Sequence, residues 1–247
     1  MSIEIHGLRK RFGDKEVLKG IDFRFERGKI NMIIGASGSG KSVMLKCIVG
    51  LNRPDDGAVR FDGTDFFSAE YAQLKQLRQH IGMLFQNSAL FDSLNVEENV
   101  AFPIRMFTRM KPAEIRDRVN FCLQRVNLSG VNKLLPSEIS GGMRKRVGIA
   151  RAIALNPKYL FVDEPNSGLD PLTSSVIDKL IQEITQEYDM TTIVVSHDMN
   201  SVMNIGDKIM FLYEGRKEWE GSRRNILQTE NEALAAFIFV SDLIKRS

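Results

Sequence analysis

The chain has 247 residues, of which 43% are hydrophobic and 26% are charged, as expected for a globular protein with a sizeable core. Its 34 Lys and Arg residues against 31 Asp and Glu residues leave a net charge of only +3, which argues against nucleic acid as a partner. The two cysteines, Cys47 and Cys122, show no disulfide or metal-ligand spacing and fit a reducing compartment.

The beginning of the chain predicts a small antiparallel sheet. Residues 3–5, 21–25 and 58–61 alternate apolar and polar side chains, and Asp62-Gly63 is a turn signal after the third segment. Residues 1–6 therefore indicate a first strand rather than a signal peptide. The longest apolar stretch, 233–240, is far shorter than the roughly 20 residues of a membrane-spanning helix. We expect any membrane crossing to be made by another chain.

The following segments predict an α/β core with a mainly parallel sheet. Residues 30–34 are a short apolar strand followed by a glycine-rich turn and a helix pattern, and residues 111–126 form an amphipathic helix within a mostly helical region, 88–157. Strands at 159–162 and 191–195 are separated by a helix at 172–187, so they should be parallel with a right-handed crossover. A hairpin at 209–213 and 217–220 precedes a helical C-terminal segment, about 222–247. The whole chain, 1–247, is expected to be a single domain.

A phosphate-binding loop is predicted between the strand at 30–34 and the next helix. The pattern G-x-x-x-x-G-K-[ST] is met by Gly35, Ala36, Ser37, Gly38, Ser39, Gly40, Lys41 and Ser42. Its glycines allow the backbone N–H groups to approach phosphate closely, at a helix N-terminus that favours negative charge. We expect Lys41 to hold the β- and γ-phosphates of a nucleotide and Ser42 to ligate Mg²⁺. A flexible serine- and glycine-rich linker is the alternative.

Two carboxylates end the apolar strand at 159–162. Asp163 and Glu164 lie where a buried parallel strand would not carry charge without a partner, and Mg²⁺ can be that partner. Asp163 is expected to bind the metal through water, and Glu164 to orient and activate the water that attacks the γ-phosphate. The alternative is a strand that runs into an acidic surface loop.

A second anion site is predicted at Ile139-Ser140-Gly141-Gly142-Met143. This segment places a serine and two glycines at the start of a helix pattern, about a dozen residues before Pro157. A simple helix-capping loop would explain the same residues.

These segments resemble the ABC transporter ATP-binding subunits, in the order of that family and over almost the whole chain. Residues 139–143 resemble its signature sequence, Gln86 its Q-loop glutamine, and His197 its switch histidine. Phe12 is similar to the aromatic that stacks on adenine, a position more often held by tyrosine. The D-loop is matched by Ser167, Gly168, Leu169 and Asp170.

The resemblance implies a P-loop ATPase fold, with an antiparallel layer and a helical subdomain, that hydrolyses Mg·ATP. It implies a homodimer in which Lys41, Ser42 and Gln86 of one copy face Ser140, Gly141 and Gly142 of the other across ATP. Gln86 would also contact Mg²⁺, and Glu164, His197, Lys41 and Gln86 would be the catalytic set. An integral membrane permease would be the partner that the ATPase drives.

The finer resemblance is to the Mla/Mce phospholipid-transport ATPases. It is carried by Met143, where glutamine is usual, by residues 91–103 and by residues 165–170. It implies phospholipid transport between the two membranes of a diderm bacterium, an Mce-type lipid-binding partner, a location at the cytoplasmic face of the inner membrane, and a permease near residues 88–103. The alternatives are a small-solute importer, for example for amino acids, and a soluble ABC ATPase without a transport role.

The remaining polar residues are expected to be structural or exposed. The run Arg144-Lys145-Arg146 predicts solvated helix surface, with a face toward phosphate or lipid headgroups as the alternative. His6 and His80 have no acidic or cysteine neighbours at metal-ligand spacing. Leu234, Phe237, Ile238 and Ile244 allow an amphipathic helix that packs on its own domain, with reinforcement of the dimer or binding of a regulator as alternatives.

Overall fold

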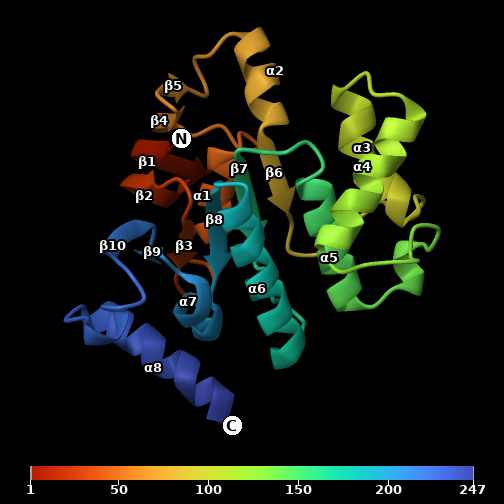
Figure 1. Cartoon of the computed structure of the whole chain (residues 1–247). Helices are drawn as coiled ribbons and strands as arrows, with labels where there is room; N and C mark the ends of the chain where they lie inside the picture. The colour runs from red at the N-terminus through yellow and green to blue at the C-terminus, as the bar shows by residue number, and fades with distance from the viewer. Residues whose placement is uncertain (1, 247) are drawn as a thin grey trace.

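The computed structural model describes residues 2–246, with side chains described for residues 2–240. Two β-sheets lie one above the other, with helices against the larger sheet and a group of helices to one side (Figure 1). The predicted α/β class is confirmed, as is a mainly parallel sheet accompanied by an antiparallel layer.

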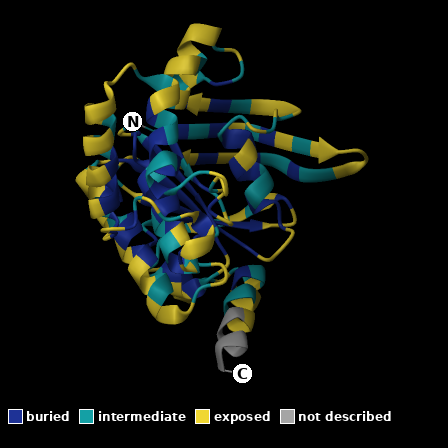
Figure 2. Ribbon diagram, turned by 90° about the vertical axis from the view of Figure 1, so that its right-hand side faces the viewer, coloured by how far each residue is buried: buried dark blue, intermediate teal, exposed yellow. Residues whose placement is uncertain are grey.

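The smaller sheet is entirely antiparallel and has the order β2-β1-β4-β5. Its strands are β1 (Ile3–Phe12), β2 (Lys15–Phe25), β4 (Asp56–Phe61) and β5 (Thr64–Asp65). Buried and solvent-facing side chains alternate along β1 and β2, which explains why the sequence pattern was visible there. Their outer ends extend beyond the body of the protein and are exposed (Figure 2).

The larger sheet has the order β10-β9-β3-β8-β7-β6 and is parallel except for the hairpin at its edge. Its strands are β3 (Ile30–Ile34), β6 (Ile81–Leu84), β7 (Tyr159–Asp163), β8 (Thr191–Ser196), β9 (Lys208–Tyr213) and β10 (Arg216–Gly221). Every residue of β3, β7 and β8 is buried. Burial on both faces accounts for their continuous apolar character.

Eight α-helices and two short 3₁₀ helices complete the described part of the chain. They are α1 (Lys41–Ile48), α2 (Tyr71–Gln79), α3 (Val96–Phe107), α4 (Pro112–Arg125), η1 (Pro136–Glu138), α5 (Gly141–Ala152), α6 (Pro171–Glu187), α7 (Met199–Ile205), η2 (Ile226–Gln228) and α8 (Glu232–Arg246). None of the helices within residues 2–246 is both long enough and apolar enough to span a bilayer.

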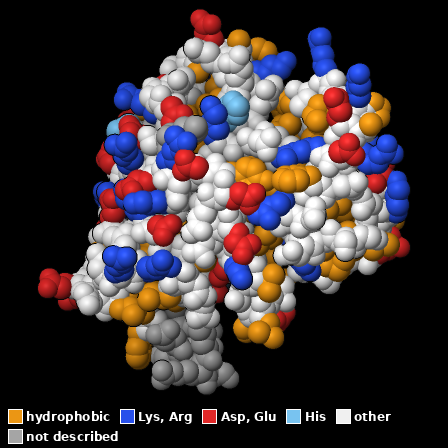
Figure 3. All heavy atoms as spheres, in the orientation of Figure 1, with side chains coloured by type: hydrophobic (Ala, Val, Ile, Leu, Met, Phe, Trp, Pro, Cys, Tyr) orange, Lys and Arg blue, Asp and Glu red, His pale blue; other side chains and the backbone are white. Residues whose placement is uncertain are grey.

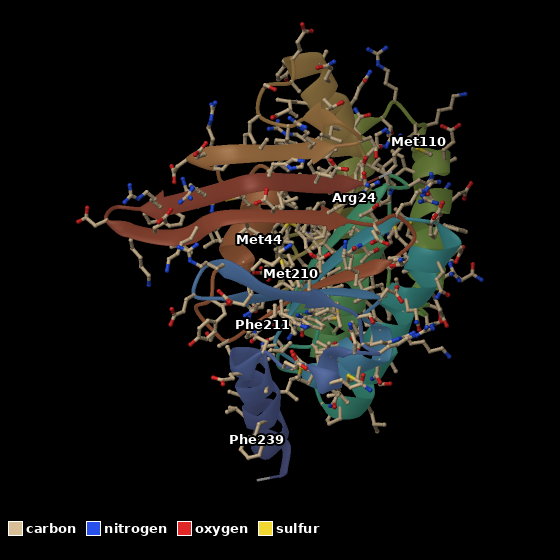
Figure 4. The ribbon with its side chains drawn as sticks, turned by 90° about the vertical axis from the view of Figure 1, so that its left-hand side faces the viewer. Arg24, Met44, Met110, Met210, Phe211 and Phe239 are labelled. Atoms are coloured by element: carbon tan, nitrogen blue, oxygen red, sulfur yellow. The ribbon has the colours of Figure 1, made fainter. Side chains whose placement is uncertain are left out.

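The larger sheet separates two hydrophobic clusters. Met210 of β9 packs with Met44 of α1 beneath the antiparallel sheet, whereas its neighbour Phe211 faces the opposite side (Figure 4). There the Phe211 ring centroid lies 5.5 Å from that of Phe237 in α8. Since successive strand residues point to opposite faces, each cluster takes alternate positions of the same strands. The strand ends that carry the polar motifs are thereby held rigidly.

The C-terminal helix packs partly on its own domain. Leu234 is fully buried and Phe237 contacts the core, whereas Phe239 and Val240 are exposed. The amphipathic helix foreseen from the sequence is therefore present, although the Ile244 side chain lies outside the described residues.

Candidate functional site

The predicted phosphate loop connects the end of β3 to the start of α1. Gly35 has a φ of 152° and Gly40 a φ of 107°, backbone conformations that residues other than glycine rarely adopt. A Cβ atom on Gly35 would also collide with the carbonyl oxygen of Leu212 on β9. The glycines therefore let the loop lie against the sheet while α1 begins directly behind it.

Two polar side chains of this loop are buried. The Lys41 ammonium donates to the carbonyl oxygens of Gly35 and Ala36, at 2.8 and 3.0 Å. Burial lowers the pKa of Lys41, and the carboxylates of Glu164 and Asp163 oppose this shift. Ser39 Oγ is buried and has no hydrogen-bond partner among the described residues. The buried Ser39 hydroxyl without a partner and the buried Lys41 ammonium suit a site for phosphate oxygens.

Ser42 and Asp163 meet beside the loop, although they are 121 residues apart in sequence. Ser42 Oγ donates to Asp163 Oδ1 at 3.2 Å. Burial raises the pKa of Asp163, an effect that the Ser42 hydrogen bond partly offsets. A buried carboxylate and a hydroxyl oxygen, together with nucleotide phosphates, form the donor set that Mg²⁺ prefers. The residues present therefore fit this ion.

Glu164 follows Asp163 in an unusual backbone conformation. Its φ is +46°, which is rare for a residue other than glycine and occurs often at functional sites. The Glu164 N–H donates to the carbonyl oxygen of Val195, at 2.9 Å, and this bond ties the turn to β8. His197 Nδ1 lies 2.8 Å from Glu164 Oε2. This hydrogen bond raises the pKa of His197.

Six of the predicted polar residues line one cavity of about 590 Å³. They are Ser37, Lys41, Ser42, Gln86, Glu164 and His197. Ala36, Ser37, Gly38 and Gly40 line it from the loop, and Phe237 and Val240 from α8. No sequence pattern indicated that α8 would reach this cavity.

A second cavity, of about 560 Å³, continues from the first because Glu164 and His197 line both. The predicted D-loop contributes Ser167, Gly168 and Leu169 to its wall. Ser167 Oγ also accepts a hydrogen bond from Gln86 Nε2 at 3.4 Å. Asp170 lies just beyond the cavity, where it caps α6 by accepting from the N–H of Thr173 at 3.0 Å.

The predicted second anion site forms the start of α5. Ser140 caps the helix, and its Oγ accepts from the N–H of Met143 at 3.2 Å. Gly142 has a packing reason of its own, because a Cβ atom there would lie 2.6 Å from Thr173 Cγ2. Ser140, Gly141 and Gly142 line neither of the two cavities. Within one copy the structure does not bring them to the phosphate loop.

Phe12 also lies apart from the cavity. It ends β1 and is 51% exposed, with the Lys10 ammonium 5.3 Å from its ring centroid. The structure thus leaves this ring free on one face, and stacking on adenine remains a prediction.

The expectation of a solvated basic run is wrong for its middle residue. Lys145 is only 4% exposed, whereas Arg144 is exposed and Arg146 half-buried. Its ammonium donates to the carbonyl oxygens of Gln86 and Glu164. Burial lowers the pKa of Lys145, and the carboxylates of Glu164 and Asp163 counteract it. The sequence signal for this contact is faint: Lys145, Gly148 and Arg151 recur at helical spacing on one side of α5.

Comparisons with known proteins show which family this chain is similar to. Residues 18–167 match the family model described as ABC transporter. The chain is 39% identical over 238 residues to the probable ribonucleotide transport ATP-binding protein mkl of Mycobacterium leprae, covering 96% of this chain and 69% of mkl. It is 38% identical over 236 residues to the intermembrane phospholipid transport system ATP-binding protein MlaF of Haemophilus influenzae, covering 96% of this chain and 89% of MlaF.

A solved structure shares most of this architecture. The ATP-binding cassette MJ0796, in a dimeric post-hydrolysis state bound to ADP and Pi, superposes with a TM-score of 0.82 at 32% identity. The match covers 90% of this chain and 99% of the cassette.

Proposed function

Because the chain belongs to the ABC transporter family, we propose that it is the ATPase that drives phospholipid transport between the inner and outer membranes of a diderm bacterium. Membership of the family makes the chain the ATP-binding subunit of an ABC transporter, which hydrolyses ATP with Mg²⁺ as the usual partner. Cassettes of this family dimerise and pair with membrane permeases. The phospholipid substrate and the residue roles are the proposal.

In the proposed reaction, Lys41 and the loop N–H groups bind the phosphates of ATP. Ser42 and Gln86 would hold the metal, with Asp163 binding it through water, and the metal would neutralise charge at the phosphates. The carboxylate of Glu164 orients the attacking water and accepts its proton. His197, which is hydrogen-bonded to Glu164 in this structure, turns its imidazole toward the γ-phosphate when ATP is bound. The observation that carries this assignment is the convergence of Lys41, Ser42, Gln86, Glu164 and His197 on one cavity, with Asp163 hydrogen-bonded to Ser42.

The second half of the ATP site comes, in this proposal, from a second copy of the chain. Ser140, Gly141 and Gly142 lie outside the phosphate-loop cavity, and the N-terminus of α5 is suited to an anion. A second copy would present this helix end to the γ-phosphate. The D-loop, residues 167–170, would cross the interface, since it walls the cavity that adjoins Glu164 and His197.

A groove beside the helical subdomain is the proposed docking place of the permease. Hydrophobic side chains gather between the core and α3 and α4 on the face in Figure 3. The groove has a volume of about 410 Å³, and its walls include Phe91, Phe102, Pro103 and Phe107, with Arg78 and Arg151 beside them. Phe91 is 43% exposed. An apolar groove with cationic edges fits an amphipathic segment of another protein.

The phospholipid substrate rests on similarity to MlaF, which spans nearly all of both chains. The mkl protein is as similar to this chain as MlaF is, and it is named for ribonucleotide transport. A small-solute importer is therefore the competing function. The phospholipid proposal includes an Mce-type lipid-binding protein as a further partner and a position at the cytoplasmic face of the inner membrane.

The experiment that decides between these functions is affinity purification of the tagged chain from native membranes in mild detergent. Mass spectrometry then identifies the co-purifying proteins and lipids. A multi-span permease with an Mce-type protein and phospholipid supports the proposal. A permease with a small-solute receptor supports the importer, and recovery without any membrane protein supports a soluble ABC ATPase.

A further inference from the structure

A buried lysine links the helix α5 to two loops of the ATP site. Lys145 Nζ donates to the carbonyl oxygen of Gln86, and it lies 3.3 Å from that of Glu164. A buried ammonium is costly unless its donors are satisfied, so the conformations of both loops are tied to the position of this side chain. Glu164 in particular is held at a positive φ. Lys145 has no role of its own in the proposed reaction.

The same side of α5 contacts the segment around Gln86 at two further points. At Gly148 a Cβ atom would lie 2.6 Å from Leu84 Cδ1 at the end of β6 and 3.5 Å from Ser88 Cβ in the loop, so the absence of a side chain allows this close approach. The Arg151 guanidinium donates to the carbonyl oxygens of Ser88 and Ala89, each at 2.6 Å. Both of these loop residues have positive φ, 60° and 44°. The loop that carries Gln86 is therefore held in an unfavourable backbone conformation by α5.

Helix α5 connects its first turn rigidly to Lys145. Its first turn, at Ser140, Gly141 and Gly142, lies outside the phosphate-loop cavity of its own copy, whereas Lys145 contacts two residues that line that cavity. From Gly141 to Lys145 the helix rises only about 6 Å. A displacement of the first turn therefore moves the Lys145 ammonium with it.

We propose that Lys145 is a positioning residue that couples the two ATP sites of a dimer. Binding of ATP to the first turn of α5, from the site of the second copy, moves Lys145 and so sets the backbone positions of Gln86 and Glu164 in its own site. The inference rests on the proposed dimeric ATPase, in which Ser140, Gly141 and Gly142 serve the other copy. A misplacement of about 1 Å at a reacting group can reduce a rate by about a hundredfold.

The test compares full-length Lys145→Met and Lys145→Arg with the matched control Arg146→Met. Arg146 is the next cation on α5, but its guanidinium donates to Asn127, away from the cavity. For each protein the Tm, the ATP affinity, kcat, KM and the Hill coefficient for ATP are measured. Methionine keeps most of the length of the side chain and removes its donors and charge, whereas arginine keeps the donors and the charge.

We expect Lys145→Met to bind ATP within about twofold of wild type, because the phosphate loop is unchanged, while kcat falls about tenfold or more. The Hill coefficient should fall from a wild-type value above one to about one. Lys145→Arg should recover most of both, and Arg146→Met should match wild type. If Lys145→Met does not fold, Lys145→Gln replaces it with the same expected loss of kcat and cooperativity.

The outcomes separate this inference from the proposed function. A wild-type chain that does not hydrolyse ATP contradicts the ATPase assignment, whatever the variants do. A wild type that hydrolyses ATP without cooperativity overturns the coupling role alone, as does a folded Lys145→Met whose kcat and Hill coefficient equal those of wild type. A change in Tm without a change in the Hill coefficient would make Lys145 a purely structural residue and also overturns it.

Discussion

The imidazole of His197 and the carboxylate of Glu164 form a hydrogen-bonded pair, with Nδ1 2.8 Å from Oε2, at the point where the two cavities meet. The Glu164 side chain is 12% exposed and that of His197 62% exposed. The pair therefore joins a shielded carboxylate to a ring that is free to turn. Because a carboxylate has two oxygens, Glu164 can accept a proton from water on Oε1 while Oε2 stays bonded to His197.

Replacement of this carboxylate is the most direct test of the residue roles. We expect Glu164→Gln to bind ATP but to hydrolyse it about 10²- to 10⁴-fold more slowly, because the amide cannot accept the proton. The closed dimer should accumulate on ATP, as measured by size-exclusion chromatography. Glu183→Gln, in an exposed ion pair on α6, is the control and should leave turnover unchanged. Wild-type turnover in Glu164→Gln would rule out the assigned role.

The phosphate-loop lysine should act on binding itself. Loss of the Lys41 ammonium removes charge-assisted hydrogen bonds worth about 1.5–3 kcal/mol, so Lys41→Ala should weaken ATP binding by about ten- to a hundredfold. Equilibrium titration with a fluorescent ATP analogue measures the change. Lys75→Ala, on the exposed face of α2, is the matched control. Unchanged affinity in Lys41→Ala would count against a nucleotide in this cavity.

The His197–Glu164 pair should also be visible in the pH dependence of stability. Because the hydrogen bond raises the pKa of His197 above its ordinary 6.5, the pair stabilises the nucleotide-free protein fully below pH 6.5. The contribution is lost as the pH rises through the higher pKa of the folded state. We expect wild type to exceed His197→Gln in Tm at about pH 5.5 by more than at about pH 8.5.

The exposure of the ring keeps this effect below about 1 kcal/mol. A difference in Tm that is constant across this pH range, or that grows toward alkaline pH, would contradict the assigned pair.

Packing at the start of α5 predicts a stability change that a second substitution can reverse. In Gly142→Ala the new methyl group would meet Thr173 Cγ2 at 2.6 Å, which should cost about 1–3 kcal/mol of unfolding free energy. Thr173→Ser removes that methyl group and keeps the hydroxyl that donates to Asp170. Urea unfolding of both single variants and of the double variant measures the coupling. Additive losses would show that the two residues do not compete for space.

The permease groove can be tested with two similarly exposed phenylalanines. We expect Phe91→Ala, at 43% exposure in the groove, to reduce co-purification of the permease and to leave the ATPase activity of the isolated chain unchanged. Phe121→Ala, at 40% exposure on α4 and outside the groove, should change neither. Equal loss of the permease in both variants would point to a different docking surface.

Contiguous sequence motifs predicted much of the architecture. The buried strands β3, β7 and β8 were visible as apolar runs, and the parallel pairing of β7 with β8 and the hairpin of β9 with β10 followed from the connections. Helix α2 was not predicted, because none of its residues is fully buried and only Leu74 and Leu77 pack against the core. Its boundary is instead set locally by a capping box between Glu70 and Gln73.

The sequence by itself determined the phosphate loop and the acidic strand end, because in each the chemistry depends on adjacent residues and on one strand or helix terminus. Only the tertiary structure decided which distant groups meet. The contacts of Lys145 with Gln86 and Glu164 span 59 and 19 residues, and that of Ser42 with Asp163 spans 121. A basic run looks the same on a solvated helix as on one that packs against a loop. Whether a lysine is buried depends on what the fold places opposite it, and a local pattern carries no record of that.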